Sequence, residues 1–209
     1  MTDSTPPRGP IIARRRLLVL APLAGLSLAA APSQAPRYTI DPRFGSITFT
    51  AHHMGLFSSS GRFRQFDADL EIDPDHLEQT RIAVEVSAAS VDMAWDDGAA
   101  MLRSPAFFDV ARHPLIRFTS TDAAALGPGK YVLRGKLEIR GVTQPLTLTA
   151  TLVGRETAGD RGGESADFVV NGALSRAAYG MVTERTFISD TIDITITARI
   201  RLAEPAHAG

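Results

Sequence analysis

From Tyr38 onward, apolar and polar residues alternate with a period of two along most of the chain. Successive side chains of a β-strand point to opposite faces, so each alternating run predicts a strand with one buried and one solvated face. Such runs cover residues 47–53, 66–72, 82–88, 116–120, 131–139, 146–152, 168–174 and 192–202. A chain built mostly of such segments buries its apolar faces by pairing them into a curved antiparallel sheet.

Turn-forming residues separate these runs, and a single segment has the features of a helix. Pro74-Asp75 and Gly127-Pro128-Gly129 are typical turn sequences. Asp96-Asp97 can cap residues 98–103, which end at Ser104-Pro105. About eight antiparallel strands with one short helix predict an all-β fold, either a closed barrel or a curved sandwich.

Small residues within the strands bear on whether such a barrel is filled or hollow. An eight-stranded barrel either fills its interior with side chains or holds one small ligand. The apolar set of almost every run contains one small residue near its middle: Ala51, Ala68, Ala88, Ser120, Gly135, Ala150, Gly172 and Ala198. A ring of small side chains predicts an apolar lumen, whereas small residues that only let strands bend predict a filled core. Both interpretations are open at this point.

Residues 1–35 have the layout of an export signal. A polar start leads to Arg14-Arg15-Arg16, then to an apolar stretch over residues 17–31, then to small residues. A membrane-spanning helix needs roughly 20 residues, so we expect no transmembrane anchor in the mature form. The twin-arginine route and the general secretory route both fit the arginines. We therefore expect a signal over residues 1–35, a folded domain over residues 36–209, and a periplasmic or secreted location.

The composition excludes several kinds of function. The chain has no cysteine, which excludes disulfides, thiolate metal sites and a cysteine nucleophile. Its formal net charge is −1 at pH 7, which gives no basic signature for nucleic acid. We expect no nucleic-acid partner, and a homodimer is left open.

Two adjacent histidines are candidates for chemistry. His52 and His53 point to opposite faces of one strand, so they cannot bind one metal ion together. The other histidines show no ligand spacing, and we expect no metal site. His53 falls on the apolar face, where it is either a wall residue or a polar contact for the head group of a ligand. His52 is predicted to be a surface residue.

A nucleophilic site is the enzymatic alternative. Ser58, Ser59 and Ser60 offer hydroxyl groups close to His53, but the chain has no G-x-S-x-G nucleophile elbow. No carboxylate is clearly placed to orient the imidazole, and Asp96-Asp97 are better explained as helix caps. We expect no enzyme, and a secreted hydrolase that uses Ser58–Ser60 with His53 is kept as an alternative.

An apolar cluster surrounds the predicted helix. Its members are Trp95, Met101, Leu102, Phe107 and Phe108. The cluster is either a plug that packs one end of the barrel or a mobile gate over an apolar cavity.

Several short strings, taken in order, resemble the YceI-like family of periplasmic polyisoprenoid-binding proteins over residues 37–202. The strings are Tyr38-Thr39-Ile40-Asp41, Ser46-Ile47-Thr48-Phe49 with His53-x-Gly55, Gly61-Arg62-Phe63, Leu102-Arg103-Ser104, Phe107-Phe108-Asp109, His113-Pro114, Phe118-Thr119-Ser120, residues 135–145, and Leu174-Ser175-Arg176 with Tyr179-Gly180. The chain departs from the family at Phe44-Gly45 and Gln144, and Leu56-Phe57 is more apolar than is usual there.

The resemblance implies an eight-stranded antiparallel lipocalin-like barrel that holds an isoprenoid or similar long-chain amphiphile without catalysis. It implies no cofactor, other than a bound polyisoprenoid or isoprenoid-quinone-like lipid. A structural, stress-protective barrel with a filled interior is the third alternative. The predicted ligand contacts are Phe49, Ala51, His53, Phe57, Phe66, Leu70, Val86, Trp95, Met101, Phe108, Phe118, Leu133, Leu137, Leu148, Ala150, Phe168, Tyr179, Ile194 and Ile196.

Overall fold

The computed structural model describes Met1 and residues 36–41, 43–156 and 165–203. The chain divides into two units, residues 1–33 and residues 34–209, and the folded part belongs to the second. The predicted export signal lies outside the described residues, except for Met1. Among the described residues, no helix combines the length and apolarity needed to cross a membrane.

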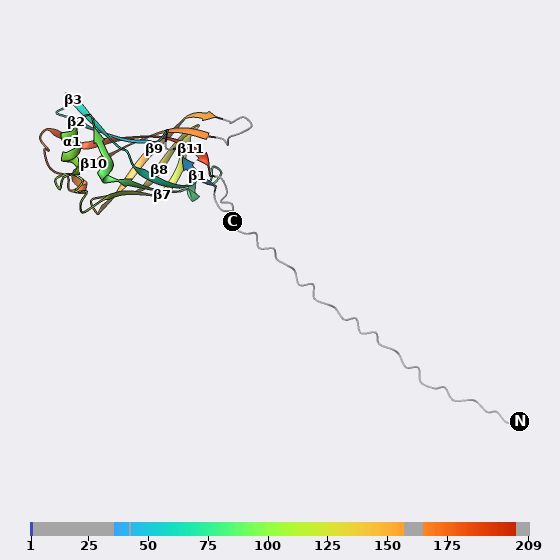
Figure 1. Cartoon of the computed structure of the whole chain (residues 1–209). Helices are drawn as coiled ribbons and strands as arrows, with labels where there is room; N and C mark the ends of the chain where they lie inside the picture. The colour runs from blue at the N-terminus through green and yellow to red at the C-terminus, as the bar shows by residue number, and fades with distance from the viewer. Residues whose placement is uncertain (2–35, 42, 157–164, 204–209) are drawn as a thin grey trace, which may run out of the picture. The chain divides into compact units, whose positions relative to one another are not determined.

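The described part of the chain consists mostly of β-strands (Figure 1). The strands are β1 (Arg37–Ile40), β2 (Ser46–His53), β3 (Phe57–Phe63), β4 (Phe66–Glu71), β5 (Arg81–Ser87), β6 (Val91–Met93), β7 (Leu115–Gly127), β8 (Lys130–Ile139), β9 (Val142–Glu156), β10 (Ser165–Ser175) and β11 (Ile188–Leu202). The α-helix is α1 (Asp96–Arg103), and three short 3₁₀ helices are η1 (Leu77–Gln79), η2 (Ala88–Ser90) and η3 (Ala177–Tyr179).

The strands close into an eight-stranded antiparallel barrel. The sheet runs in the order β4-β5-β7-β8-β9-β10-β11, and β1 closes it by pairing with both β11 and β4. β2 continues the position of β1 along β11, since Ile40 pairs with Ile200 and Ile47 with Ile196. β3 and β6 continue β4 and β5 in the same way. The closed-barrel prediction is confirmed. Three of the eight strand positions are each formed by two separate strands, β1 with β2, β4 with β3, and β5 with β6.

The alternating pattern missed β3 and the second half of β7. β3 has the sequence FSSSGRF, in which serine and glycine occupy positions that an apolar strand would fill with large side chains. β7 contains an irregularity between Ser120 and Asp122 that inserts one residue into the ladder. The insertion shifts the alternation of inward and outward side chains by one residue. Before it the even-numbered Phe118 faces the interior, and after it the odd-numbered Ala123 does.

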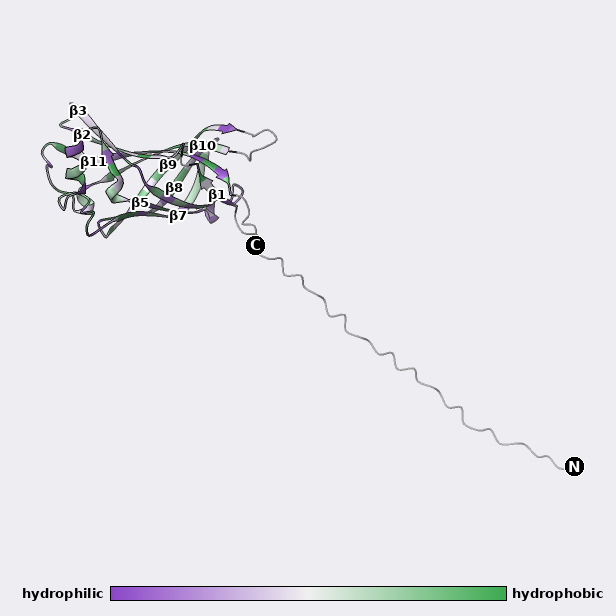
Figure 2. Cartoon of the chain, viewed as in Figure 1, coloured by the Kyte–Doolittle hydropathy of each residue, from purple (hydrophilic) through white to green (hydrophobic). Residues whose placement is uncertain are grey.

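Large aromatic side chains fill part of the interior. The Phe63 ring lies 5.6 Å from the Phe49 ring and 5.5 Å from the Phe108 ring, measured between centroids. Val91 and Tyr179 are almost completely buried in the same cluster. Figure 2 shows hydrophobic and hydrophilic residues interspersed along the barrel strands, as expected where one face of each strand is buried.

Most of the small residues near the middle of the predicted strands do not border empty space in the barrel. A Cβ added to Gly135 would lie 2.5 Å from the Phe118 ring, and one added to Gly172 would lie 2.5 Å from Leu148 Cδ2. These glycines therefore make room for a large neighbour that lies flat across the strand. Of the eight small residues near the middle of the predicted strands, Ala51, Ala150 and Ala198 line the cavity described below, and the other five do not.

Candidate functional site

A cavity of about 630 Å³ lies inside the barrel. Its wall extends from the α1 end, which carries α1 and the β2–β3 turn, to the β1 end, which carries β1 and the last residues of β11 (Figure 1). Trp95 and Met101 line it at the α1 end, and Tyr38 and Ile200 line it at the β1 end. Most wall residues are aliphatic or aromatic, so the cavity suits an elongated apolar ligand.

All but three of the predicted ligand contacts lie on the wall of this cavity. These are Phe49, Ala51, His53, Leu70, Val86, Trp95, Met101, Phe108, Phe118, Leu133, Leu137, Leu148, Ala150, Phe168, Ile194 and Ile196. The structure brings them together because strand parity places alternate residues inside a closed barrel. Their contact with a ligand is still a prediction.

Phe57, Phe66 and Tyr179 do not line the cavity. We use the word mouth for the α1 end of the cavity, where the partly exposed Trp95 and Met101 line it. Phe57 shares the parity of the wall residue Ser59 but lies beyond the mouth, with 65% of its surface exposed. Phe66 is half-buried, and its ring lies against Gly45 instead of facing the cavity. Tyr179 is in η3, where burial among core residues raises the pKa of its hydroxyl to about 12.

The predicted ligand contacts do not include the wall residues of β1 or of the connection between β4 and β5. Tyr38 and Ile40 alternate with exposed residues, but β1 is only four residues long. Leu77 and Thr80 belong to a connection with no period of its own. Within the described part of the chain, Thr80 Oγ1 is buried without a hydrogen-bond partner.

A polar pair lies on the wall at the α1 end. His53 Nε2 is 2.7 Å from Ser59 Oγ, and the imidazole stacks on the Phe57 ring at 5.0 Å between centroids. His52 points outward, with Nε2 at 2.9 Å from Asp193 Oδ2. The predicted opposite orientation of the two histidines is therefore observed.

The other two serines of the hydrolase alternative point away from His53. Ser58 and Ser60 are exposed, and Ser60 Oγ hydrogen-bonds to Thr50 Oγ1 at 2.8 Å. Within the described residues, the His53 side chain has Ser59 as its hydrogen-bond partner, and no carboxylate contacts the imidazole. An activated serine normally needs a base that is itself oriented by a third group. In the described ranges, no group of three or more His, Asp or Glu side chains is placed to hold a metal ion.

A buried arginine organises the chain next to the mouth. Arg176 is 3% exposed and lies on the cavity wall. Its guanidinium donates hydrogen bonds to four backbone carbonyls, those of Met181 (2.9 Å), Thr183 (2.7 Å), Ile188 (3.0 Å) and Ser189 (2.9 Å). Burial lowers the pKa of this guanidinium. The four bonds fix the course of residues 181–189, which lead into β11.

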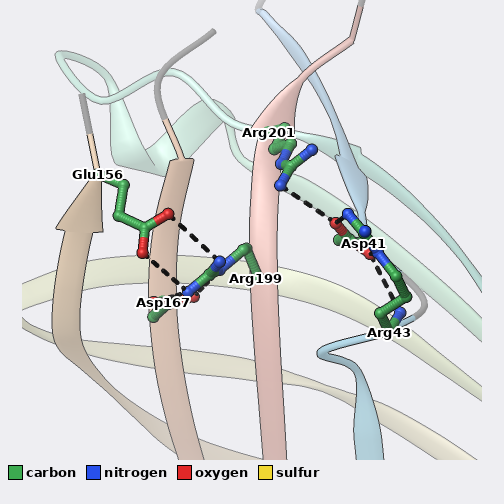
Figure 3. A network of polar contacts seen from close by, with 6 residues as sticks. All are labelled: Asp41, Arg43, Glu156, Asp167, Arg199 and Arg201. Carbon is green, nitrogen blue, oxygen red and sulfur yellow. Dashed lines mark hydrogen bonds and ion pairs between the residues drawn. The ribbon is translucent and has the colours of Figure 1, made fainter. Parts of the chain in front are cut away.

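An ionic network borders the β1 end (Figure 3). Its members are Asp41, Arg43, Glu156, Asp167, Arg199 and Arg201. Asp41 contacts Arg43 Nη2 at 2.7 Å and Arg201 Nη2 at 3.2 Å, and the hydrogen bond from Arg43 holds the pKa of Asp41 well below its usual range. Arg199 contacts Asp167 at 2.6 Å and lies over the Phe44 ring at 4.0 Å. The network ties β9, β10 and β11 to the end of β1.

Comparison with known proteins places this architecture in a family. The family model described as YceI-like domain matches residues 38–200. A UPF0312 protein of Azotobacter vinelandii is 28% identical over 88% of this chain and 96% of its own length. A UPF0312 protein of Shewanella denitrificans is 32% identical over 78% of this chain and 86% of its own length.

Solved structures show the same fold. BcnA of Burkholderia cenocepacia superposes with a TM-score of 0.68 at 21% identity, over 77% of this chain and 98% of that one. The Campylobacter jejuni YceI protein gives 0.66 at 25% identity, over 73% and 90%. A polyisoprenoid binding domain from Saccharophagus degradans gives 0.56 at 15% identity, over 82% and 100%. With a family match that covers most of its length and the closed barrel in common, the chain belongs to the YceI-like family.

Proposed function

We propose that this protein is a non-catalytic binding protein of the periplasm or the secreted fraction, which holds an isoprenoid or similar long-chain amphiphile for carriage or storage. The observation that carries the proposal is the apolar cavity of about 630 Å³ between the two ends of the barrel. The polyisoprenoid binding domain from Saccharophagus degradans, which shares the fold, supports the class of ligand.

The physical chemistry of the cavity suits such a ligand. Removing a methylene group from water is worth about 0.8 kcal/mol, so a long prenyl chain gains much from an enclosed apolar wall. Small-molecule sites typically have volumes of roughly 300–1,000 Å³, and this cavity falls within that range. An isoprenoid quinone or a polyprenol would satisfy the same wall.

The polar end of the ligand is assigned to the α1 end of the cavity. His53 and Ser59 form a hydrogen-bonded pair on the wall there, and most of the wall residues around the cavity are apolar. An imidazole can donate or accept a hydrogen bond according to its tautomer, and a hydroxyl can do both. The pair can therefore bind a hydroxyl, carbonyl or similar oxygen group without requiring a charged head.

Two alternatives fit the structure less well. A hydrolase would need an oriented base, whereas the His53 imidazole contacts Ser59 and no carboxylate within the described residues. A stress-protective barrel without a ligand would need a filled interior, whereas this barrel contains a cavity. Export is proposed from the arginines and the apolar stretch of residues 1–35.

Solvent extraction and native mass spectrometry of the purified mature protein test the proposal. We expect a long-chain lipid to be recovered with the protein, and a one-to-one complex to form when a polyprenol or a long-chain quinone is added. Protein that carries no lipid and binds neither added compound would refute it.

A further inference from the structure

Exposed apolar side chains surround the mouth of the cavity at the α1 end. We call this group the apolar rim, and its members are Met54, Leu56, Phe57, Trp95, Met101, Val182 and Phe187. They come from the β2–β3 turn and the first residue of β3, from α1 with the residue before it, and from the segment that precedes β11. Leu56 is 82% exposed and Phe57 65%, whereas a core position would bury both.

The sheet brings the three segments to one end of the barrel. β2 pairs with β11 at His53↔Ile188 and with β3 at His53↔Phe57. The chain from Met54 to Phe57 and the Val182–Phe187 segment therefore lie at the same end of the barrel. β3 pairs with β6 at Gly61↔Met93, and α1 follows β6 directly.

The backbone of the first of these segments holds Met54 in a left-handed conformation that a non-glycine residue rarely adopts. The amide of Leu56 donates to the His53 carbonyl at 3.0 Å, and Met54 and Gly55 between them have φ values of 48° and 70°. A tight turn with two left-handed residues normally carries Asn or Gly at the first of them. Methionine at this position instead projects an apolar side chain that is 65% exposed.

The second segment is fixed by the buried Arg176. Its guanidinium binds the carbonyls of Met181, Thr183 and Ile188, on both sides of the exposed Val182 and Phe187. The carbonyl of Glu184 accepts from the amides of Phe187 at 3.0 Å and Ile188 at 2.8 Å. These bonds hold both apolar side chains outward instead of letting them fold onto the barrel.

The apolar rim is continuous with the cavity. Trp95 and Met101 are 46% and 41% exposed and also line the cavity wall. The indole of Trp95 lies directly over Gly98, where any larger residue would displace it. An apolar surface therefore runs from the outside of the molecule into the binding cavity without a polar break at these two residues.

The two ends of the barrel differ in chemistry. The β1 end also has exposed apolar side chains, namely Leu126, Val153 and Leu202, but it carries in addition the ionic network of Asp41, Arg199 and their partners, whose charges need water or each other. Aromatic and aliphatic side chains are favoured at the boundary between lipid head groups and acyl chains. The segments that carry the apolar rim also hold exposed charges of both signs, such as Glu184 and Arg185, so we expect any attraction of the rim to a surface to be apolar rather than electrostatic.

We propose that the apolar rim inserts into the head-group region of a phospholipid bilayer and places the cavity mouth in contact with membrane lipid. An insoluble amphiphile could then pass between bilayer and cavity without crossing water. The exchange step and the choice of a bilayer as partner rest on the function proposed above, whereas the exposure of the rim does not. A bilayer is favoured over a second copy of the chain because the exposed Trp95 and Met101 make the apolar rim continuous with the apolar cavity wall, so a membrane lipid at the rim has an apolar path into the cavity.

Flotation with phosphatidylcholine vesicles tests the docking. The rim variant L56S/V182S/F187S removes three exposed side chains that do not line the cavity. The matched control L126S/V153S/L202S removes three side chains of similar exposure (59%, 61% and 56%) near the β1 end. We expect the wild type and the control to bind vesicles and the rim variant to bind at least about tenfold more weakly. Raising the salt concentration should change the binding little.

Equal flotation of the rim and control variants, or no flotation of the wild type, would overturn the docking proposal. A rim variant that turns a dimer into a monomer, with no variant binding vesicles, would assign the rim to self-association. Titration with a soluble short-chain polyprenol separates this proposal from the function. The rim variant should bind this compound as the wild type does. If the wild type binds vesicles but binds no polyprenol, the proposed function is rejected and the docking proposal stands.

Discussion

His53 and Ser59 face each other on neighbouring strands inside the mouth of the barrel, with Nε2 of the imidazole 2.7 Å from Oγ of the serine. Both side chains line the cavity, and the neighbouring histidine, His52, points to the opposite face. The pair is therefore available to a ligand in the cavity. It offers hydrogen-bond donors and acceptors on a wall that is mostly apolar.

Removal of the imidazole tests the assignment of the polar end. We expect His53→Ala to weaken the binding of a polyprenol by about threefold to tenfold, since one hydrogen bond contributes roughly 0.5–1.5 kcal/mol net. Binding of an isoprenoid hydrocarbon without a head group should change much less. His52→Ala is the matched control and should leave both affinities unchanged. Fluorescence titration that follows Trp95 provides the measurement, and an equal loss for both ligands would contradict the assignment.

The Asp41 ion pairs predict a specific dependence of stability on pH. The hydrogen bond from Arg43 is the largest cause that lowers the pKa of Asp41 from its ordinary value of 3.8. A carboxyl group with a lowered pKa in the folded state stabilises the protein above its unfolded pKa, and this contribution is lost as the pH falls below that value. We expect Asp41→Asn to lower the Tm at neutral pH.

The difference in Tm between wild type and Asp41→Asn should shrink as the pH is lowered below about 4. Thermal unfolding followed by circular dichroism across this pH range checks the prediction. Asp69→Asn, on the exposed face of β4, serves as the control and should show a smaller difference at neutral pH. A constant difference at all pH values would mean that Asp41 acts through packing instead of charge.

Arg176 is predicted to be essential for the stability of the mouth. Arg176→Ala would leave four carbonyls without their donor, and each buried carbonyl without a partner costs about 1–3 kcal/mol. We expect the free energy of unfolding to fall by about 3 kcal/mol or more. Arg176→Lys should not restore it, because an ammonium cannot reproduce the planar arrangement of donors. Denaturant titration measures the change, and full stability of the lysine variant would contradict this account.

Export predicts the N-terminus of the mature protein. Mass spectrometry of protein from the periplasm or the culture medium should find a first residue between about Ala30 and Tyr38. Arg14→Lys combined with Arg15→Lys should block export if the twin-arginine route is used, and should leave it unchanged if the general route is used. Full-length protein retained in the cytoplasm would reject the predicted location.

Strand parity predicted an antiparallel β-fold and most of the cavity wall, and the resemblance to the YceI-like family selected the closed barrel over a curved sandwich. Alternation put Ala150 and Ile194 inside and Thr149 and Asp193 outside, which is the arrangement in the structure. Parity says nothing about where along a strand the cavity ends, and Phe57 therefore proved to lie beyond the mouth.

Side-chain packing was less predictable. The sequence left open whether Gly135 and Gly172 border a lumen or let the strands pack closely, and in the structure Phe118 and Leu148 from neighbouring strands occupy the space above them. Such contacts depend on the register between strands that are distant in the sequence, which no single run reveals. The phase shift in β7 was missed for a similar reason, since a bulge has no period.

The central claim is that a lipid occupies the cavity, and the neighbouring residues Ala150 and Thr149 test it most directly. Ala150 lines the cavity, whereas Thr149 is exposed on the outer face of β9. Native mass spectrometry with added polyprenol should show a complex for the wild type and Thr149→Phe, and little or none for Ala150→Phe. The Ala150→Phe protein should keep most of its stability, because its ring enters empty space, whereas overpacking a filled core costs about 1–3 kcal/mol. Equal lipid binding by both phenylalanine variants would contradict the claim.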